Sequence, residues 1–196
     1  MAMSGGKALR GPQSSGYLFG RRELVASALL QQLDMDDRSE TWVPPRLVEP
    51  YRLEGMPRHG FGRGFKVGKE EIAGAVAAVR DFADHSEEYL KAWEDQCLFA
   101  ATELEGLPGL RVDYQSTTET GRVPLLLLEF EEATRARQVS IALRAGDPAV
   151  HLNERWLDRG RLVLNPVGLA EGQERLVAER VRSALADADS GTTTLV

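Results

Sequence analysis

The sequence is poor in the residues that build disulfide frameworks and zinc sites. Of its 196 residues, one is cysteine and three are histidine. One thiol cannot close an intrachain disulfide, and His59, His85 and His151 are scattered without the spacing of zinc ligands. We therefore predict no metal centre, and a protein of a reducing, cytoplasmic compartment.

Long apolar runs and an excess of positive charge are also missing. The longest uncharged apolar stretch covers residues 123–128, whereas a membrane helix needs ~20 apolar residues. The first residues lack the apolar run of a signal peptide. The net charge of -6 opposes binding to a polyanion, which depends on lysine and arginine displacing counterions. We expect neither a membrane nor a nucleic acid as partner.

The residues that are present predict two differently patterned parts. In the first part, residues 17–19 predict a buried strand between turns, and residues 21–33 predict an amphipathic helix. Residues 41–68 are rich in proline and glycine, which predicts a long irregular segment between two domains. We expect this segment to pack down through its aromatic side chains, which are Trp42, Tyr51, Phe61 and Phe65.

A long helix is predicted from Lys69 to Leu104. Apolar or small residues recur there at steps of three and four, and the pattern is interrupted only at Ser86, where a bend is expected. A straight helix of this length spans about 54 Å, which is longer than a small domain. We therefore expect it to connect two lobes.

After residue 106 the pattern becomes that of an α+β domain. Residues 110–114 alternate and residues 123–130 form an apolar run, which together predict a hairpin. A helix is predicted over residues 134–145, and a last helix carries an apolar face from Leu176 to Leu185. Further short strands are predicted at residues 150–152, 156–157 and 161–164. Together these elements predict an antiparallel sheet with helices on one face.

Three clusters each allow a functional and a structural interpretation. The glycine-rich residues 60–64 look like a phosphate loop, but no strand precedes them, and Glu70 stands where a Walker motif has Ser or Thr. Residues 46–69 contain six cations and two carboxylates, so they could hold an anionic group or form a solvated basic loop. Four acids could bind a divalent cation but lack the spacing of a calcium loop, which favours a solvated acidic loop. They are Asp34, Asp36, Asp37 and Glu40.

The cysteine and the histidines give no catalytic arrangement. Cys97 lies on the apolar face of the predicted long helix and is interpreted as a core residue rather than a nucleophile. His59 and His151 have no partner that the sequence reveals, so we assign them structural or surface roles. A Ser-His-Asp triad cannot be assigned.

The motif with the most chemical content surrounds Lys7. It reads Ser4-Gly5-Gly6-Lys7-Ala8-Leu9-Arg10-Gly11-Pro12-Gln13. A lysine among small residues, followed by a turn and a strand, can project its amine into a cleft where a carbonyl compound approaches closely. A desolvated lysine amine loses its proton and becomes the nucleophile of Schiff-base chemistry. Composition alone favours a flexible surface lysine.

Several motifs follow one another over the first third of the chain. They are Ser4-Gly5-Gly6-Lys7 with Gly11-Pro12-Gln13, then residues 20–24 (Gly-Arg-Arg-Glu-Leu), residues 33–36 (Leu-Asp-Met-Asp), Glu40-Thr41-Trp42, and residues 62–72 (Gly-Arg-Gly-Phe-Lys-Val-Gly-Lys-Glu-Glu-Ile). This ordered set resembles the selenocysteine-synthase-like branch of the type I pyridoxal-phosphate (PLP) enzymes. That branch includes L-seryl-tRNA(Sec) selenium transferases and D-glucosaminate-6-phosphate ammonia-lyases.

The resemblance implies a fold and a division into domains. The fold is the α/β type I PLP-dependent transferase fold, represented here by its carboxyl-terminal portion. Residues 1–68 would be the end of the PLP-binding large domain with a crossing loop, and residues 69–105 the long connecting helix. Residues 106–188 would form the α+β small domain with its antiparallel sheet, followed by a polar tail at residues 189–196.

The resemblance also implies a cofactor and a site. Lys7 matches the lysine that carries PLP as a Schiff base, and Ser4 and Gly6 would contact the cofactor beside it. Further candidates, for anchoring anionic groups of the substrate or of the cofactor, are Arg10, Arg63 and Lys66. Selenium transferases carry a basic stretch where this chain has the acidic residues 33–37. We therefore expect elimination from a small amino acid or amino sugar rather than selenium transfer, in a homodimer or larger assembly.

Two other functions stay open. The chain begins six residues before Lys7, and the upstream phosphate-binding loop, the acid at the pyridine nitrogen and the ring-stacking residue of such enzymes are not found in it. We expect a carboxyl-terminal fragment for this reason. The alternative is a non-catalytic interaction or regulatory module without a cofactor cradle. A third hypothesis is a phosphate-binding regulator that uses residues 46–69.

Overall fold

The chain divides into two compact units, which are described separately. A computed structural model describes residues 1–51, 55–121 and 123–189. Unit 1 comprises residues 1–84 and unit 2 comprises residues 85–196. The division falls inside the long helix, whereas the sequence analysis placed limits at residues 68 and 105. Arg52 and nearly all of the predicted tail at 189–196 lie outside the described residues.

Unit 1 begins with a short ribbon and a helix. Strand β1 (Ala2–Ser4) pairs antiparallel with β2 (Gly16–Leu18), and helix α1 (Arg22–Gln32) follows, as predicted for residues 21–33. The strand predicted near residue 17 exists, but the expectation that it is buried is wrong. Leu18 and Phe19 are 49% and 43% exposed. A two-stranded ribbon presents its side chains on both faces, and the described part of unit 1 covers these two only partly.

The segment between α1 and the long helix is irregular, as predicted, apart from a 3-10 helix η1 (Phe61–Phe65). Phe61 and Phe65 were expected to pack down, and this is wrong, because they are 87% and 72% exposed. Gly62 is the buried residue of η1, and a Cβ atom there would lie 2.3 Å from the Gln32 side-chain nitrogen. The glycine therefore makes the contact with α1, and the two phenylalanines at the ends of η1 point elsewhere.

Helix α2 (Lys69–Leu104) has the predicted limits. Its backbone leaves the helical region at His85, where φ is -123° and ψ is 15°, one residue before the predicted bend at Ser86. The sequence signal was the loss of apolar periodicity at that point. Among the described residues, no helix is both long enough and apolar enough to cross a membrane.

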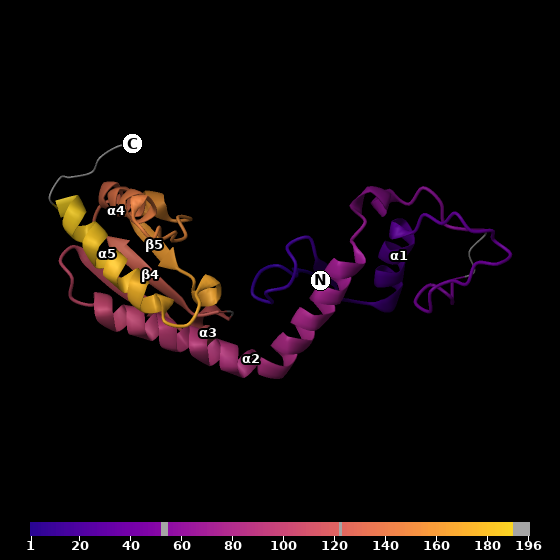
Figure 1. Cartoon of the computed structure of the whole chain (residues 1–196), viewed down its shortest axis with the longest axis horizontal. Coiled ribbons are helices and arrows are strands. Elements are labelled where there is room, and N and C mark those ends of the chain that lie inside the picture. Colours follow the sequence, from indigo (N-terminus) through magenta and orange to yellow (C-terminus); the bar gives the residue numbers. More distant parts are fainter. Residues whose placement is uncertain (52–54, 122, 190–196) are drawn as a thin grey trace. The chain divides into compact units, whose positions relative to one another are not determined.

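Unit 2 contains a three-stranded antiparallel sheet in the order β3-β4-β5 (Figure 1). The strands are β3 (Leu110–Gln115), β4 (Leu125–Phe130) and β5 (Arg161–Leu164). The predicted hairpin is confirmed, because Leu110 pairs with Phe130 and Gln115 pairs with Leu125. The helical elements are α3 (Thr117–Thr120), α4 (Ala133–Ala145), η2 (Leu157–Arg159), η3 (Pro166–Gly168) and α5 (Gln173–Asp189).

The strands predicted at residues 150–152 and 156–157 do not form. Asn153 makes one isolated bridge to Val163, and its side-chain oxygen accepts a hydrogen bond from the Arg155 amide at 2.9 Å. This local turn competes with extended backbone. Leu157 begins η2 instead. Only the third of the predicted short strands, residues 161–164, belongs to the sheet.

The core of unit 2 lies where one face of the sheet meets three helices. Its buried side chains come from the second half of α2, from α4, from α5 and from alternate residues of the strands; the largest include Leu104, Leu126, Leu128, Leu143 and Leu162. The opposite face of the sheet carries Glu129, whose carboxylate lies 2.7 Å from Arg161 Nε and 3.7 Å from Arg111 Nη1. The predicted α+β architecture is thus confirmed for this unit.

Candidate functional site

The predicted lysine sits on a short loop that the ribbon closes. The loop runs from residue 5 to residue 15, between β1 and β2. The Gly5 amide donates to the Ser15 carbonyl oxygen at 2.9 Å, and the Gly11 amide donates to the Gly5 carbonyl oxygen at 2.9 Å. The Arg10 amide donates to the Lys7 carbonyl oxygen at 2.8 Å, which makes a turn with Lys7 at its start. These hydrogen bonds fix the backbone on which Lys7 stands.

Two of the glycines in this loop are required by close approach of its two limbs. A Cβ atom on Gly6 would lie 2.6 Å from Gln13 Cα, and one on Gly5 would lie 2.1 Å from Ser15 Oγ and 3.1 Å from the Ser15 carbonyl oxygen. The Gln13 side chain also crosses the loop and donates to the Gly6 carbonyl oxygen at 2.9 Å. The Ser4-Gly5-Gly6-Lys7 motif therefore makes a loop that is tighter than other residues allow.

The loop rests on the first half of α2. The Tyr17 hydroxyl donates to the Ala75 carbonyl oxygen at 2.6 Å. A Cβ atom on Gly74 would lie 2.7 Å from Pro12 Cγ, so the helix approaches Pro12 closely at its glycine. Leu9, in the middle of the loop, is buried. Long-range contacts thus hold the loop in place, and no sequence pattern predicts the Tyr17 contact.

The structure brings four of the predicted site residues together in this loop. Lys7 is exposed, so the expectation that a cleft desolvates its amine is wrong for the described chain. Ser4 is the last residue of β1, directly before the loop, and pairs with Gly16 across the ribbon. Gly6 accepts the Gln13 hydrogen bond described above. Arg10 is exposed and has a left-handed backbone with φ of 55°. This arrangement can present an amine and a guanidinium from one rigid turn, while the roles assigned to the four residues stay predictions.

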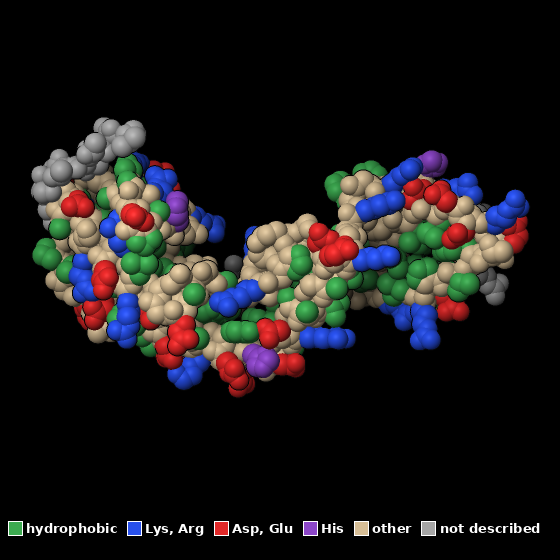
Figure 2. Space-filling view, in the orientation of Figure 1, with side chains coloured by type: hydrophobic (Ala, Val, Ile, Leu, Met, Phe, Trp, Pro, Cys, Tyr) green, Lys and Arg blue, Asp and Glu red, His purple; other side chains and the backbone are tan. Residues whose placement is uncertain are grey.

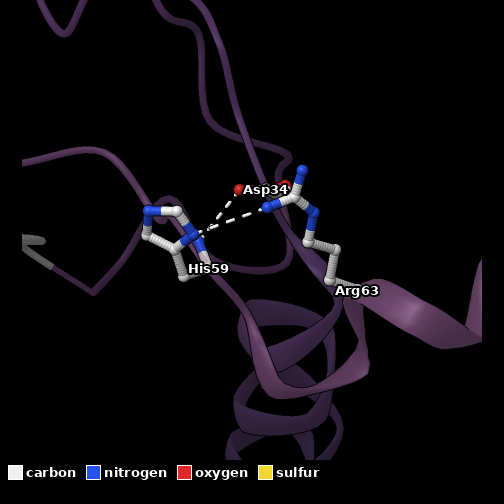
Figure 3. Close-up of polar contacts among 3 residues, drawn as sticks. All are labelled: Asp34, His59 and Arg63. Carbon is white, nitrogen blue, oxygen red and sulfur yellow. Dashed lines mark hydrogen bonds and ion pairs between the residues drawn. The ribbon is translucent and has the colours of Figure 1, made fainter.

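Arg63 belongs to a second cluster, around Asp34 (Figure 3). Arg63 Nε lies 2.7 Å from Asp34 Oδ2, and the His59 amide donates to Asp34 Oδ1 at 2.9 Å. His59 Nδ1 lies 3.5 Å from Arg63 Nη1. The Asp34 side chain is 10% exposed. The hydrogen bond from the His59 backbone holds the pKa of Asp34 below its usual value, and the charges of Arg63 and Lys66 act in the same direction.

This cluster fastens the glycine-rich segment to the end of α1. His59 has a left-handed φ of 53°, and a Cβ atom on Gly60 would lie 2.5 Å from the carbonyl oxygens of Gln31 and Leu33. Gly60 and Gly62, two of the three glycines that make residues 60–64 look like a phosphate loop, thus serve close packing at the end of α1. Lys66 lies three residues after Arg63 and is exposed.

The acidic cluster is divided by the structure. Asp34 has the structural partners just described, whereas Asp36, Asp37 and Glu40 are exposed. Within the described residues, no group of three or more His, Cys, Asp or Glu side chains is placed to hold a metal ion. Sequence reasoning missed the role of Asp34, although an acid at the unfavourable end of a helix dipole was a signal for it.

Cys97 is a core residue, as predicted. It is fully buried in the apolar cluster of unit 2. Burial raises the pKa of its thiol to about 12, and the charge of Glu94 adds to this. A thiol with so high a pKa is not a nucleophile near neutral pH.

Comparison with known proteins places these features in context. No protein-family model matches the chain. It is 27% identical over 188 residues to a 5'-C-glycyluridine monooxygenase-decarboxylase from a Streptomyces species, covering 94% of this chain and 40% of that protein. It is 25% identical over 183 residues to the D-glucosaminate-6-phosphate ammonia lyase of Salmonella typhimurium, covering 91% of this chain and 41% of that protein.

The fold agrees with these similarities. A solved structure of a D-glucosaminate-6-phosphate ammonia-lyase matches 96% of this chain with a TM-score of 0.59 at 24% identity, and 44% of its own length is covered. The chain therefore spans about two fifths of the length of its relatives. The resemblance predicted from the motifs is confirmed: nearly the whole chain is similar to D-glucosaminate-6-phosphate ammonia lyase and its relatives.

Proposed function

We propose that this chain is the carboxyl-terminal portion of a type I PLP-dependent lyase or transferase that acts on a small amino acid or amino sugar. Two relatives named as enzymes, one of them an ammonia lyase, support this function. The observation that carries it is the rigid, hydrogen-bonded loop that presents the exposed Lys7. Elimination is favoured over selenium transfer, and the complete enzyme is proposed to be cytoplasmic and a homodimer or larger assembly.

The Lys7 loop suits covalent attachment of a carbonyl cofactor. Attachment needs an accessible amine on a well-fixed backbone, because reacting groups must be held within a fraction of an ångström of the productive geometry. Lys7 is exposed, and Gly5 and Gly6, on its amino-terminal side, closely approach the opposite limb of the loop. Ser4 and Gly6 would line the cofactor beside it. When bound, the cofactor supplies an electron sink for negative charge at the substrate Cα.

Proton transfer and the binding of anionic groups are assigned to four side chains. The Lys7 Nζ atom would take a proton from the substrate Cα and return it, as general base and acid. Arg10 and Lys66 would bind anionic groups of the substrate. Arg63 can share that task only through its terminal nitrogens, since its Nε atom is paired with Asp34.

Selective labelling of Lys7 tests the proposal. The chain has only four lysines, Lys7, Lys66, Lys69 and Lys91. The full chain is incubated with PLP, reduced with borohydride and analysed by peptide mass mapping. We expect Lys7 to be labelled about tenfold more than the other lysines, which corresponds to about 1.4 kcal/mol of preference. The Lys7→Arg variant, which keeps the charge, should show only the background on the other three.

The labelling pattern also separates this proposal from the alternative. Equal labelling of all four lysines and of the amino terminus would contradict a cofactor site at Lys7. Such a result would favour a non-catalytic interaction module. The amino-terminal amine is an internal reference for an amine that is already hydrogen-bonded, because it donates to the Phe19 carbonyl oxygen at 2.6 Å.

A further inference from the structure

The two edges of the unit 2 sheet differ in how their backbone groups are used. Strand β5 forms one edge, and the chain itself pairs its outward groups. The Asn153 amide donates to the Val163 carbonyl oxygen at 2.9 Å, and the Val163 amide donates to the Asn153 carbonyl oxygen at 3.0 Å. The Arg161 amide donates to the Trp156 carbonyl oxygen at 3.1 Å. Strand β3 forms the other edge, and no such segment runs beside it among the described residues.

The hydrogen-bond pattern of β4 decides which groups of β3 point away from the sheet. The Phe130 amide donates to the Gly160 carbonyl oxygen at 2.8 Å, so it faces β5 and not Leu110, its pairing partner on β3. In an antiparallel ladder, successive residues turn their backbone groups to opposite sides. Every second residue of β3 therefore points its amide and carbonyl outward, and these residues are Leu110, Val112 and Tyr114.

We call these outward backbone groups of β3 the open edge. The Leu110 amide closes a turn to the Leu107 carbonyl oxygen at 3.2 Å. In the part of the chain that the structure describes, the Val112 and Tyr114 amides have no hydrogen-bond partner. The register with β4 is unbroken from Leu110 to Gln115, and β3 contains neither proline nor lysine. An edge without a bulge, a proline or a lysine is a template for a further strand.

We infer that the open edge pairs with the open edge of a second copy of this chain, antiparallel and centred on Val112. In this register Val112 lies opposite the partner's Val112, and Arg111 lies opposite the partner's Asp113. The two Val112 residues exchange two hydrogen bonds, and each Tyr114 amide donates to the partner's Leu110 carbonyl oxygen. A twofold axis relates the copies and makes one continuous sheet of their strands. The contact is independent of the chemistry at Lys7.

The charges of β3 favour its own copy as the added strand. Side chains directly opposite each other on paired strands interact, and opposite charges there stabilise the pair. The strand has one arginine and one acid, and centring on Val112 brings them together twice. The Arg111 side chain is 79% exposed and reaches Glu129 only at 3.7 Å, and Asp113 accepts a hydrogen bond from the Gln115 side chain at 3.3 Å. Both groups keep capacity for a further partner.

The surroundings of the open edge also suit a second copy. The Thr117 hydroxyl, just after β3, donates to Glu94 Oε1 at 2.7 Å, which places that side of α2 beside β3. Leu98 lies one turn further along the same side and is 46% exposed, the one exposed large hydrophobic residue in the described part of unit 2. The face of unit 2 drawn in Figure 2 mixes basic and acidic side chains, so it presents no field of one sign to a copy.

Hydrogen exchange at single amides, measured over a range of protein concentrations, tests the inference. The full chain is followed from micromolar to near-millimolar concentration, and sedimentation velocity reports the fraction of dimer. We expect the Val112 and Tyr114 amides to become about tenfold more protected as the dimer forms. The Arg111 and Asp113 amides face β4 and should keep their rates at every concentration. A chain that stays monomeric, or protection at Val112 that does not depend on concentration, would overturn the inference.

Charge variants test the register. Arg111→Asp places a carboxylate opposite the partner's Asp113 and should weaken the dimer about tenfold or more, which corresponds to about 1.4 kcal/mol. The exchange Arg111→Asp/Asp113→Arg restores opposite charges and should recover the affinity. Arg159→Asp, at an exposed residue of η2, is the matched control with the same change of charge and should have no effect. Circular dichroism checks that each variant folds. A dimer that Arg111→Asp leaves intact, or that the exchange does not recover, would contradict this pairing.

Discussion

Replacing Gly6 by alanine should open the loop that carries Lys7. The new Cβ atom would lie 2.6 Å from Gln13 Cα and 2.8 Å from Gln13 Oε1. Because the nearer atom is backbone, the two limbs of the loop must separate, and a rotamer change cannot relieve the contact. Gly5 and Gly11 would then lose the hydrogen bonds that close the loop, which are 2.9 Å long in each case.

The size of this effect follows from the cost of overpacking. One extra methyl group against fixed neighbours costs about 1–3 kcal/mol. A cost of about 2 kcal/mol makes local opening about thirtyfold more frequent. Gly64 is the matched control, because a Cβ atom there meets nothing within 4 Å. Gly64→Ala should be neutral or stabilise the chain by about 0.4–1 kcal/mol.

Hydrogen exchange at single amides measures the effect. In Gly6→Ala the Gly5 and Gly11 amides should exchange about thirtyfold faster, while amides in the sheet of unit 2 keep their rates. The preference of PLP for Lys7 should fall in parallel. Unchanged protection at Gly11, or the same acceleration in Gly64→Ala, would refute the reasoning that close packing of the glycines fixes the loop.

Two further predictions concern groups with shifted pKa values. Cys97, whose pKa is raised to about 12, should react with a thiol reagent at pH 8 only after the chain is denatured, and rapid reaction of the native chain would contradict its burial. The pKa of Asp34 is lowered by its contacts, so they stabilise the fold fully above the ordinary value of 3.8, and this stabilisation is lost as the pH falls through the lower value of the folded state. Carboxyl chemical shifts and exchange of the His59 amide should follow that titration, which Asp34→Asn should abolish.

Much of the fold could be predicted from local patterns. The limits of helix α2 could be predicted because apolar residues recur at helical spacing along almost its whole length. The hairpin could be predicted because the alternating residues 110–114 are followed by the apolar run at residues 123–130. Burial in unit 1 could not be predicted, because periodicity shows which side chains share a face but not whether anything covers it. Phe61, Phe65 and Leu18 are exposed for this reason.

The local structure around the proposed site residues could be predicted in part. A tight loop around Lys7 followed from its small residues. Gly6 and Arg10 lie with Lys7 in the loop of residues 5–15, and Ser4 ends β1 directly before it, while the roles of all four residues stay predictions. The pairing of Arg63 with Asp34 joins residues far apart in the sequence, and composition treats them as a basic and an acidic loop. Hydrogen bonds of this kind depend on tertiary structure, which single-sequence patterns do not encode.

The charged face of the sheet also decides how β4 can lie. Leu125–Leu128 are four consecutive leucines, so hydrophobicity alone does not distinguish the core face of this strand from the other. Glu129 does, because it meets Arg111 and Arg161 in one arrangement only. A slip by one residue would turn this carboxylate into the leucine core without a partner, at a cost of about 3–5 kcal/mol. A single acidic residue at the end of a run of leucines thus selects one register of the strand over the register that is shifted by one residue.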